Sequence, residues 1–221
     1  QEETEDGNGA VVAILRTIDN APIYYTLDGT EPATTSKQYD GTGIVIRQSA
    51  DLRAVAIRPE GKSKVVERSF NFNKATFRPI ELTGAQPAPK YAFKGATTLT
   101  DGMSGNNNYA TGDWLGFISG DVTAVIDLGS PTGNATAGIA AGPAEIKRVA
   151  THAVVDMSAW ISGCTGLAVS VSDDNKSFRE VASKDFPAET DIRKKAVVDY
   201  EITFAPVKTR YVKVTIKRTP T

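Results

Sequence analysis

The sequence of 221 residues contains very little cysteine and histidine, with one of each. A single cysteine excludes a disulfide within the chain, and we expect Cys164 to be a small buried side chain. Structural zinc sites take most of their four ligands from these two residue types, so a zinc site is excluded as well. We expect the one histidine, His152, to be a hydrogen-bonded, partly buried strand residue rather than a ligand.

An excess of charge of one sign and long apolar runs are also absent. The chain has 25 basic and 26 acidic residues, so it lacks the surplus of Lys and Arg that nucleic acid binding requires. No run of about eighteen apolar residues occurs, so we expect neither a transmembrane helix nor insertion into a membrane. The sequence shows no signal peptide, and its polar, acidic start predicts a mobile lead-in over residues 1–9.

Helical periodicity is missing too, because no stretch repeats apolar residues at helical spacing over three turns. Strand patterns are present instead. Ile23 to Leu27 alternates apolar and polar-leaning positions, Asp28-Gly29 supplies a turn, and Leu52 to Ile57 alternates again. Short strands about ten residues apart with turns between them are typical of a β-sandwich. Residues 10–73 are therefore predicted to form a small immunoglobulin-like sandwich.

The strand pattern loosens over residues 74–89, where three prolines predict a connector. It resumes in residues 90–221. The clearest strand lies near the end of the chain, where Val212, Val214 and Ile216 form an apolar face opposite a more polar one. The sequence thus predicts an all-β chain with two sandwich domains.

Two sets of motifs resemble known families. Residues 23–32 (IYYTLDGTEP) with residues 52–56 (LRAVA) resemble the immunoglobulin-like C-terminal domain of bacterial chitobiases and β-hexosaminidases. The second set resembles discoidin domains (coagulation factor five/eight type C), whose bacterial relatives include family-32 carbohydrate-binding modules. It consists of the motifs LTDG at 99–102, WLGF at 114–117, AVIDLG at 124–129, IKRV at 146–149, VSVSD at 169–173 and RYVK at 210–213.

The resemblance implies a galactose-binding-like jelly roll for the second domain. It also implies an origin in the accessory region of a bacterial family-20 β-hexosaminidase, whose catalytic barrel this chain does not contain. The expected ligands are glycans carrying galactose or N-acetylhexosamine. The expected location is secreted, periplasmic or cell-surface, and a monomer is expected.

No pattern in the sequence predicts an active site. A glycosidase needs two carboxylates facing each other across a cleft. The adjacent acidic pairs Glu2-Glu3 and Asp173-Asp174 lie in a tail and a turn, where neighbouring side chains point apart or into solvent. The Gly-x-Ser-x-Gly elbow and phosphate-binding loops are also missing. We therefore expect a chain that is not an enzyme.

A sugar site needs an aromatic surface for the apolar face of a pyranose and a few polar groups for its hydroxyls. The candidate loop residues are Tyr109 and Trp160, with Asn107 and Asn108 as hydrogen-bonding partners. Ordinary packing explains the same residues: Trp160 as a loop anchor tucked into the core, and the asparagines as turn residues.

A structural calcium ion is also expected from the resemblance, because related modules bind one in the loop holding the Asp-Gly step. The matching side chains are Asp101 and Asn106. Calcium prefers oxygen ligands gathered in a loop. The alternative is that Asp101 only caps its own turn.

Three functions remain open from the sequence. The leading one is a glycan-binding module that keeps a glycosidase on its substrate. The others are a structural spacer without a sugar site and a protein–protein adhesion module, because the fold does not fix the function. Exposed aromatic loop residues would favour binding, and buried ones would favour a spacer.

Overall fold

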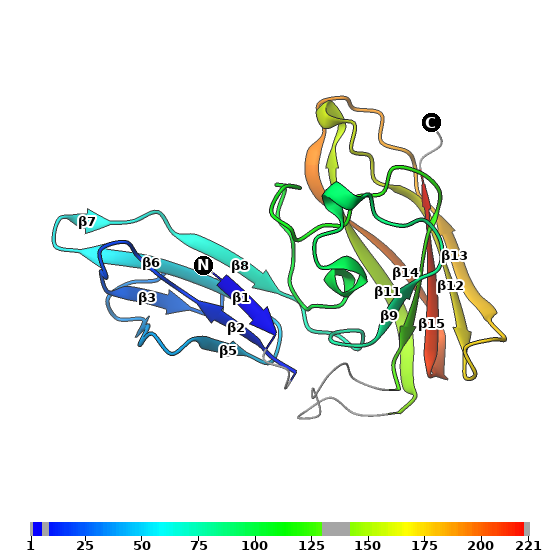
Figure 1. Cartoon of the computed structure of the whole chain (residues 1–221), viewed down its shortest axis with the longest axis horizontal. Coiled ribbons are helices and arrows are strands. Elements are labelled where there is room, and N and C mark those ends of the chain that lie inside the picture. Colours follow the sequence, from blue (N-terminus) through cyan, green and yellow to red (C-terminus); the bar gives the residue numbers. More distant parts are fainter. Residues whose placement is uncertain (1, 6–8, 130–141, 219–221) are drawn as a thin grey trace. The chain divides into compact units, whose positions relative to one another are not determined.

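The computed structural model describes residues 2–5, 9–129 and 142–218, which divide into two compact units. Of the described residues, the first unit holds 2–5, 9–76 and 101–104, and the second holds 77–100, 105–129 and 142–218. The predicted all-β fold is confirmed, since the helical elements described are three short 3₁₀ turns (Figure 1). Over the described ranges, no helix has the length and apolar character needed to cross a membrane.

The first unit contains two antiparallel sheets. One has the order β1-β2-β5, from β1 (Glu2–Glu5), β2 (Val11–Ile14) and β5 (Ile44–Ile46). The other has the order β4-β3-β6-β7, with β8 also paired to β6. Its strands are β3 (Ile23–Thr26), β4 (Lys37–Gln38), β6 (Ala50–Arg58), β7 (Gly61–Lys62) and β8 (Val66–Phe70).

Alternating strand residues supply the core of this unit. Val11 and Ala13 of β2, Ile44 and Ile46 of β5 and Leu52 of β6 are each at most 5% exposed. Their polar or partly exposed neighbours lie on the opposite face, as the period of two in a strand requires. The apolar alternation read from the sequence therefore builds the sandwich.

The second unit is built from a five-stranded antiparallel sheet and a long two-stranded ladder (Figure 1). The larger sheet has the order β13-β12-β15-β10-β9, and the ladder pairs β11 with β14. The strands are β9 (Ile80–Leu82), β10 (Val122–Asp127), β11 (Ala144–Asp156), β12 (Cys164–Ser172), β13 (Arg179–Asp185), β14 (Lys195–Thr209) and β15 (Tyr211–Arg218). The 3₁₀ turns are η1 (Pro89–Tyr91), η2 (Gly95–Leu99) and η3 (Met157–Ala159).

One buried cluster joins both sheets of the second unit. Leu167 and Val169 of β12 are 0% exposed, and they share this cluster with Val212 and Val214 of β15 and Ile202 of β14. The apolar face predicted for the last strand is confirmed. A core built from both sheets gives rigid support to the loops between the strands.

The structure departs from the expected domain limits at three places. The lead-in expected over residues 1–9 contains β1, whose backbone groups pair with the edge of β2. The connector expected over residues 74–89 contains β9, which pairs with β10 through alternating Ile80, Glu81 and Leu82. Residues 101–104 belong to the first unit, because the 102–104 stretch hydrogen-bonds to β8 and the residue after it.

Candidate functional site

The loop between β11 and β12 carries Trp160 on a tight connection that we call the Trp160 loop (residues 157–160). Asp156 and Ile161 close its base through two backbone hydrogen bonds of 2.9 and 3.0 Å. The loop then turns through η3, and the amide of Trp160 donates to the carbonyl of Met157 at 3.3 Å. Trp160 ends the turn in the left-handed conformation, with φ 61° and ψ 28°.

Asp156 organises this loop from beneath. Its carboxylate accepts hydrogen bonds from the Ser158 hydroxyl at 2.6 Å and from the Ala159 amide at 3.3 Å. It also pairs with the Lys195 ammonium at 3.0 Å, while its own side chain is only 4% exposed. The hydrogen bond from Ser158 and the interactions with Lys195 lower the pKa of Asp156, so the carboxylate stays charged at neutral pH.

The side chain of Trp160 projects into solvent. Its exposed fraction is 95%, whereas most tryptophans in folded proteins are largely buried. The loop joining β13 to β14 runs beside it, because the Met157 amide donates to the Lys194 carbonyl at 3.0 Å. That second loop carries Ile192, which is 74% exposed. The alternative in which Trp160 anchors the core does not fit this exposure, and its contact with sugar stays a prediction.

Gly163 explains how the chain returns from the Trp160 loop into β12. A Cβ at this position would overlap the hydroxyl of Tyr200 and lie 3.2 Å from Val155 Cγ2. Tyr200 is itself 8% exposed and packs edge-on against Phe186, with 5.1 Å between ring centroids. The absence of a side chain at 163 thus permits the close approach. The sequence analysis did not identify this role.

The second predicted aromatic, Tyr109, lies in an asparagine-rich segment (residues 106–109) of the second unit. Tyr109 is half-buried, and the three asparagines before it are exposed. The Asn106 side chain accepts from the Asn108 amide at 2.8 Å, and the Asn108 side chain accepts from the Ala110 amide at 3.1 Å. Turn formation, the alternative noted for these asparagines, accounts for these two side-chain oxygens.

Trp114 fixes the same segment from below. Its indole N–H donates to the Asn106 carbonyl at 2.9 Å, and the backbone of Gly105 lies directly against its ring. Among the residues that the structure describes, no hydrogen bond or ring contact joins this segment to Trp160. The structure therefore does not bring the predicted sugar-binding residues into one contact network.

The two predicted calcium ligands belong to different units. Asp101 lies in the first unit, although the sequence placed it in the second domain, and Asn106 lies in the second unit. The carboxylate of Asp101 accepts from the Met103 amide at 3.0 Å, as expected of a residue that caps its own turn. Over the described ranges, no cluster of three or more His, Cys, Asp or Glu residues suited to a metal occurs. Calcium therefore remains a prediction.

The other reactive side chains also have structural explanations. Cys164 is buried, as expected, and burial raises the pKa of its thiol to about 11. His152 Nδ1 lies 2.5 Å from the Asp199 carboxylate on the β11–β14 ladder, so the expected hydrogen bond is present. The His152 side chain is 41% exposed.

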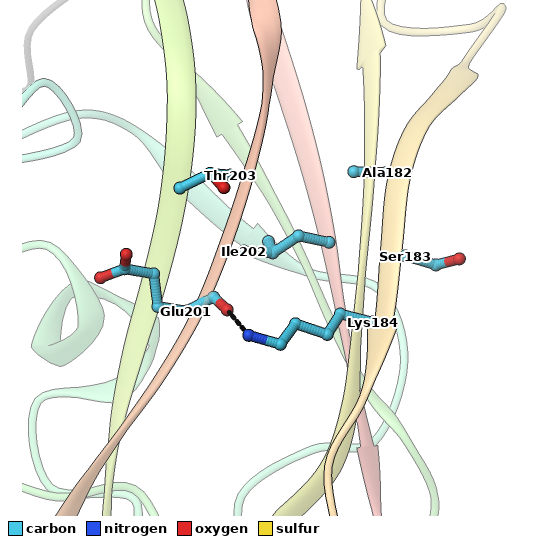
Figure 2. A pocket seen from close by; sticks show the side chains of 6 residues that line it. All are labelled: Ala182, Ser183, Lys184, Glu201, Ile202 and Thr203. Carbon is cyan, nitrogen blue, oxygen red and sulfur yellow. Dashed lines mark hydrogen bonds between the residues drawn. The ribbon is translucent and has the colours of Figure 1, made fainter.

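A shallow hollow opens between β13 and β14. In Figure 2 the Lys184 ammonium donates to the Glu201 carbonyl at 3.1 Å, while the Glu201 carboxylate points away from that lysine. The lining residues are Ala182, Ser183, Lys184, Glu201, Ile202 and Thr203. The hollow contains no exposed aromatic ring and none of the predicted site residues. It is a gap between sheet edges rather than a sugar pocket.

Comparison with known families gives a match within the first unit. A family model described as Fn3 associated matches residues 12–70. No curated protein matches the sequence. The matched residues lie within the stretch 10–73, which the strand spacing predicted to be a separate sandwich domain.

Solved structures similar to this chain include two chitosan-binding modules from a chitosanase/glucanase of Paenibacillus sp. IK-5. Module 1 has 14% identity and a TM-score of 0.39, covering 66% of this chain and 87% of its own. Module 2, in complex with chitotriose, has 18% identity and a TM-score of 0.36, with the same two coverages. CpGH89CBM32-5 from Clostridium perfringens, in complex with GalNAc-beta-1,3-galactose, has 16% identity and a TM-score of 0.38, covering 63% of this chain and 84% of its own.

Proposed function

We propose that the second unit is a non-catalytic glycan-binding module that contacts its sugar through Trp160. The observation that carries this proposal is the 95% exposure of an indole on a loop whose backbone is fixed by hydrogen bonds. An exposed ring of this size adds nothing to the core, yet it offers a flat apolar surface to a ligand. Aromatic rings with nearby polar groups are the usual contacts for ligands that are apolar on one side and polar on the other.

The backbone of Trp160 supports the same proposal. A left-handed conformation costs a residue with a Cβ about 1–2 kcal/mol relative to a right-handed one. Trp160 has φ 61°, so the loop tolerates this cost at its tip. Strained residues of this kind concentrate at ligand-binding positions. The same residue that adopts this conformation carries the exposed ring, which suits a ring that meets a ligand.

The proposal extends to the biological setting that the sequence resemblance implies. A module with one open aromatic surface binds weakly, but tethering it to a glycosidase raises the local concentration of enzyme at the substrate. We infer a secreted, periplasmic or cell-surface location beside an enzyme of the β-hexosaminidase type. The proposed ligands carry galactose or N-acetylhexosamine. A structural calcium ion at the Asp101 turn belongs to the same inference.

Calorimetric titration of the whole chain with galactose, N-acetylgalactosamine and N-acetylglucosamine, with and without calcium, tests the proposal. We expect saturable binding that Trp160→Ala removes and Trp160→Phe partly keeps. Ile118→Ala is the matched control, because Ile118 is a 71% exposed apolar residue of the same unit. Absence of heat for every sugar would instead favour a spacer, and an equal loss in the control would show that Trp160 is not the specific contact.

A further inference from the structure

Phe93 is a second exposed aromatic residue with a left-handed backbone. It lies between η1 and η2 of the second unit, with φ 40° and a side chain that is 50% exposed. A positive φ is an outlier for a bulky residue, and such outliers persist where the surrounding structure enforces them. Phe93 therefore shares two unusual features with Trp160.

A glycine of another segment lies near the Phe93 ring. A Cβ at Gly112 would lie 3.4 Å from Phe93 Cδ1 and 3.8 Å from both Cγ and Cε1, so the chain at Gly112 passes close to one side of the ring. Gly112 has φ 84°, a conformation that glycine adopts readily. A side chain that is half exposed still presents part of its ring to solvent.

The segment beside the ring is held in place by its own hydrogen bonds. The Thr111 hydroxyl lies 3.0 Å from the Asn108 carbonyl and 2.8 Å from the Asp113 carboxylate. Further along, the Gly116 amide donates to the Tyr91 carbonyl at 3.2 Å, which joins this segment to η1. The flat ring thus lies beside a fixed, polar loop, which is the combination that a pyranose ligand requires.

We propose that Phe93 is a second sugar-contacting platform, and this inference rests on the proposed glycan-binding function. Two platforms on one unit allow it to hold a multivalent glycan at two points. Its ligand class is then an oligosaccharide or polysaccharide rather than a single sugar, because the second contact becomes intramolecular once the first has formed. The asparagine-rich segment would then have a supporting role, because its Asn108 carbonyl accepts from the Thr111 hydroxyl, next to Gly112.

Retention on immobilised, densely displayed sugar, compared with free monosaccharide titration, tests the second platform. We expect Phe93→Ala to weaken retention on the dense surface about tenfold, and Phe93→Ala with Trp160→Ala to abolish it. Phe93→Leu keeps an apolar side chain but removes the flat ring, so it should weaken retention almost as much as Phe93→Ala. Ile118→Ala is again the control, because it truncates another exposed apolar side chain of the same unit.

A variant with a fluorescent residue at position 93 distinguishes a direct sugar contact from a purely structural role of Phe93. In Phe93→Trp combined with Trp160→Phe, which should keep part of the binding, sugar should change the fluorescence of the new indole. Wild-type retention by Phe93→Ala, together with loss in Trp160→Ala, would overturn the second platform while leaving the proposed function intact. No retention of the unmodified chain on any sugar would instead overturn the proposed function itself. Thermal melts of each variant show whether the fold is kept.

Discussion

The Trp160 loop and the asparagine-rich segment belong to the same unit, and each contains an aromatic residue between strands. In the first, Asp156 holds the backbone from below and Trp160 is 95% exposed. In the second, the Trp114 indole bonds the backbone and Tyr109 is half-buried. The comparison shows that side-chain hydrogen bonds from Asp156 fix one loop while its aromatic ring stays exposed, whereas the other segment is fixed by an aromatic side chain, the Trp114 indole.

The largest change in stability is expected from a substitution at Gly163, where the chain returns from the Trp160 loop to the core. Gly163→Ala should lower the free energy of unfolding by about 1–3 kcal/mol, because the new Cβ overlaps the Tyr200 hydroxyl. Chemical denaturation measures the change. Adding Tyr200→Phe removes that hydroxyl and should restore part of the stability. An equal loss in the single and double variants would show that the collision is not the cause.

The second prediction separates stability from binding at the loop tip. Trp160→Gly should reduce sugar affinity about thirtyfold, the ~2 kcal/mol typical of a truncated aromatic anchor. The same change should raise the free energy of unfolding by about 0.5–1 kcal/mol, because glycine relieves the left-handed strain. Calorimetry and denaturation on one preparation measure both. If Trp160→Gly lowered the free energy of unfolding, the backbone of Trp160 would not be strained. If it kept the sugar affinity, Trp160 would not contact the sugar.

The third prediction uses the charge of Asp156. Its pKa is lowered in the folded state, so its stabilising effect is present above the ordinary value of about 4 and is lost as the pH falls below it. Asp156→Asn should therefore be less stable than the unmodified chain at pH 7, and the gap should narrow toward pH 3. Denaturation at both pH values gives the comparison. If the difference in the free energy of unfolding between the two proteins grew toward pH 3, the charge of the Asp156 carboxylate would not be what stabilises the fold.

The smallest effects are expected in the asparagine-rich segment. Asn108→Ala should lower the free energy of unfolding by about 0.5–1 kcal/mol, since the Ala110 amide loses its acceptor. Asn107→Ala should change it by less than about 0.5 kcal/mol, as is usual for exposed positions. Monosaccharide affinity should hold within about twofold in both variants. A loss in Asn107→Ala as large as that of Trp160→Ala would move the primary sugar site to this segment.

Most of the fold follows from patterns within single strands. The alternation at Val212, Val214 and Ile216 correctly predicted a half-buried strand, because a period of two requires no knowledge of the partner strands. The three residues of β9 were missed because so short an alternation lies among prolines. β1 was missed because its acidic sequence has no apolar face, and only pairing with β2 defines it.

The site depends more on contacts between distant positions. The sequence identified Trp160 as a candidate but left its exposure open, since the cap from Asp156 and the neighbouring β13–β14 loop decide it. Phe93 was not predicted at all, because the glycine near its ring lies in another segment of the chain. Asp101 lies in the LTDG motif that the sequence placed in the second domain, yet in the structure it belongs to the first unit. Motifs therefore locate candidate residues, and packing decides their roles.

Fluorescence titration of the unmodified chain most directly tests the claim that Trp160 contacts sugar. The chain has two tryptophans, and only Trp160 is almost fully exposed, while the Trp114 indole is bonded internally. The account predicts a saturable blue shift with sugar that disappears in Trp160→Ala and persists in Trp114→Phe. A flat response at every sugar concentration, or a shift that survives Trp160→Ala, would contradict it.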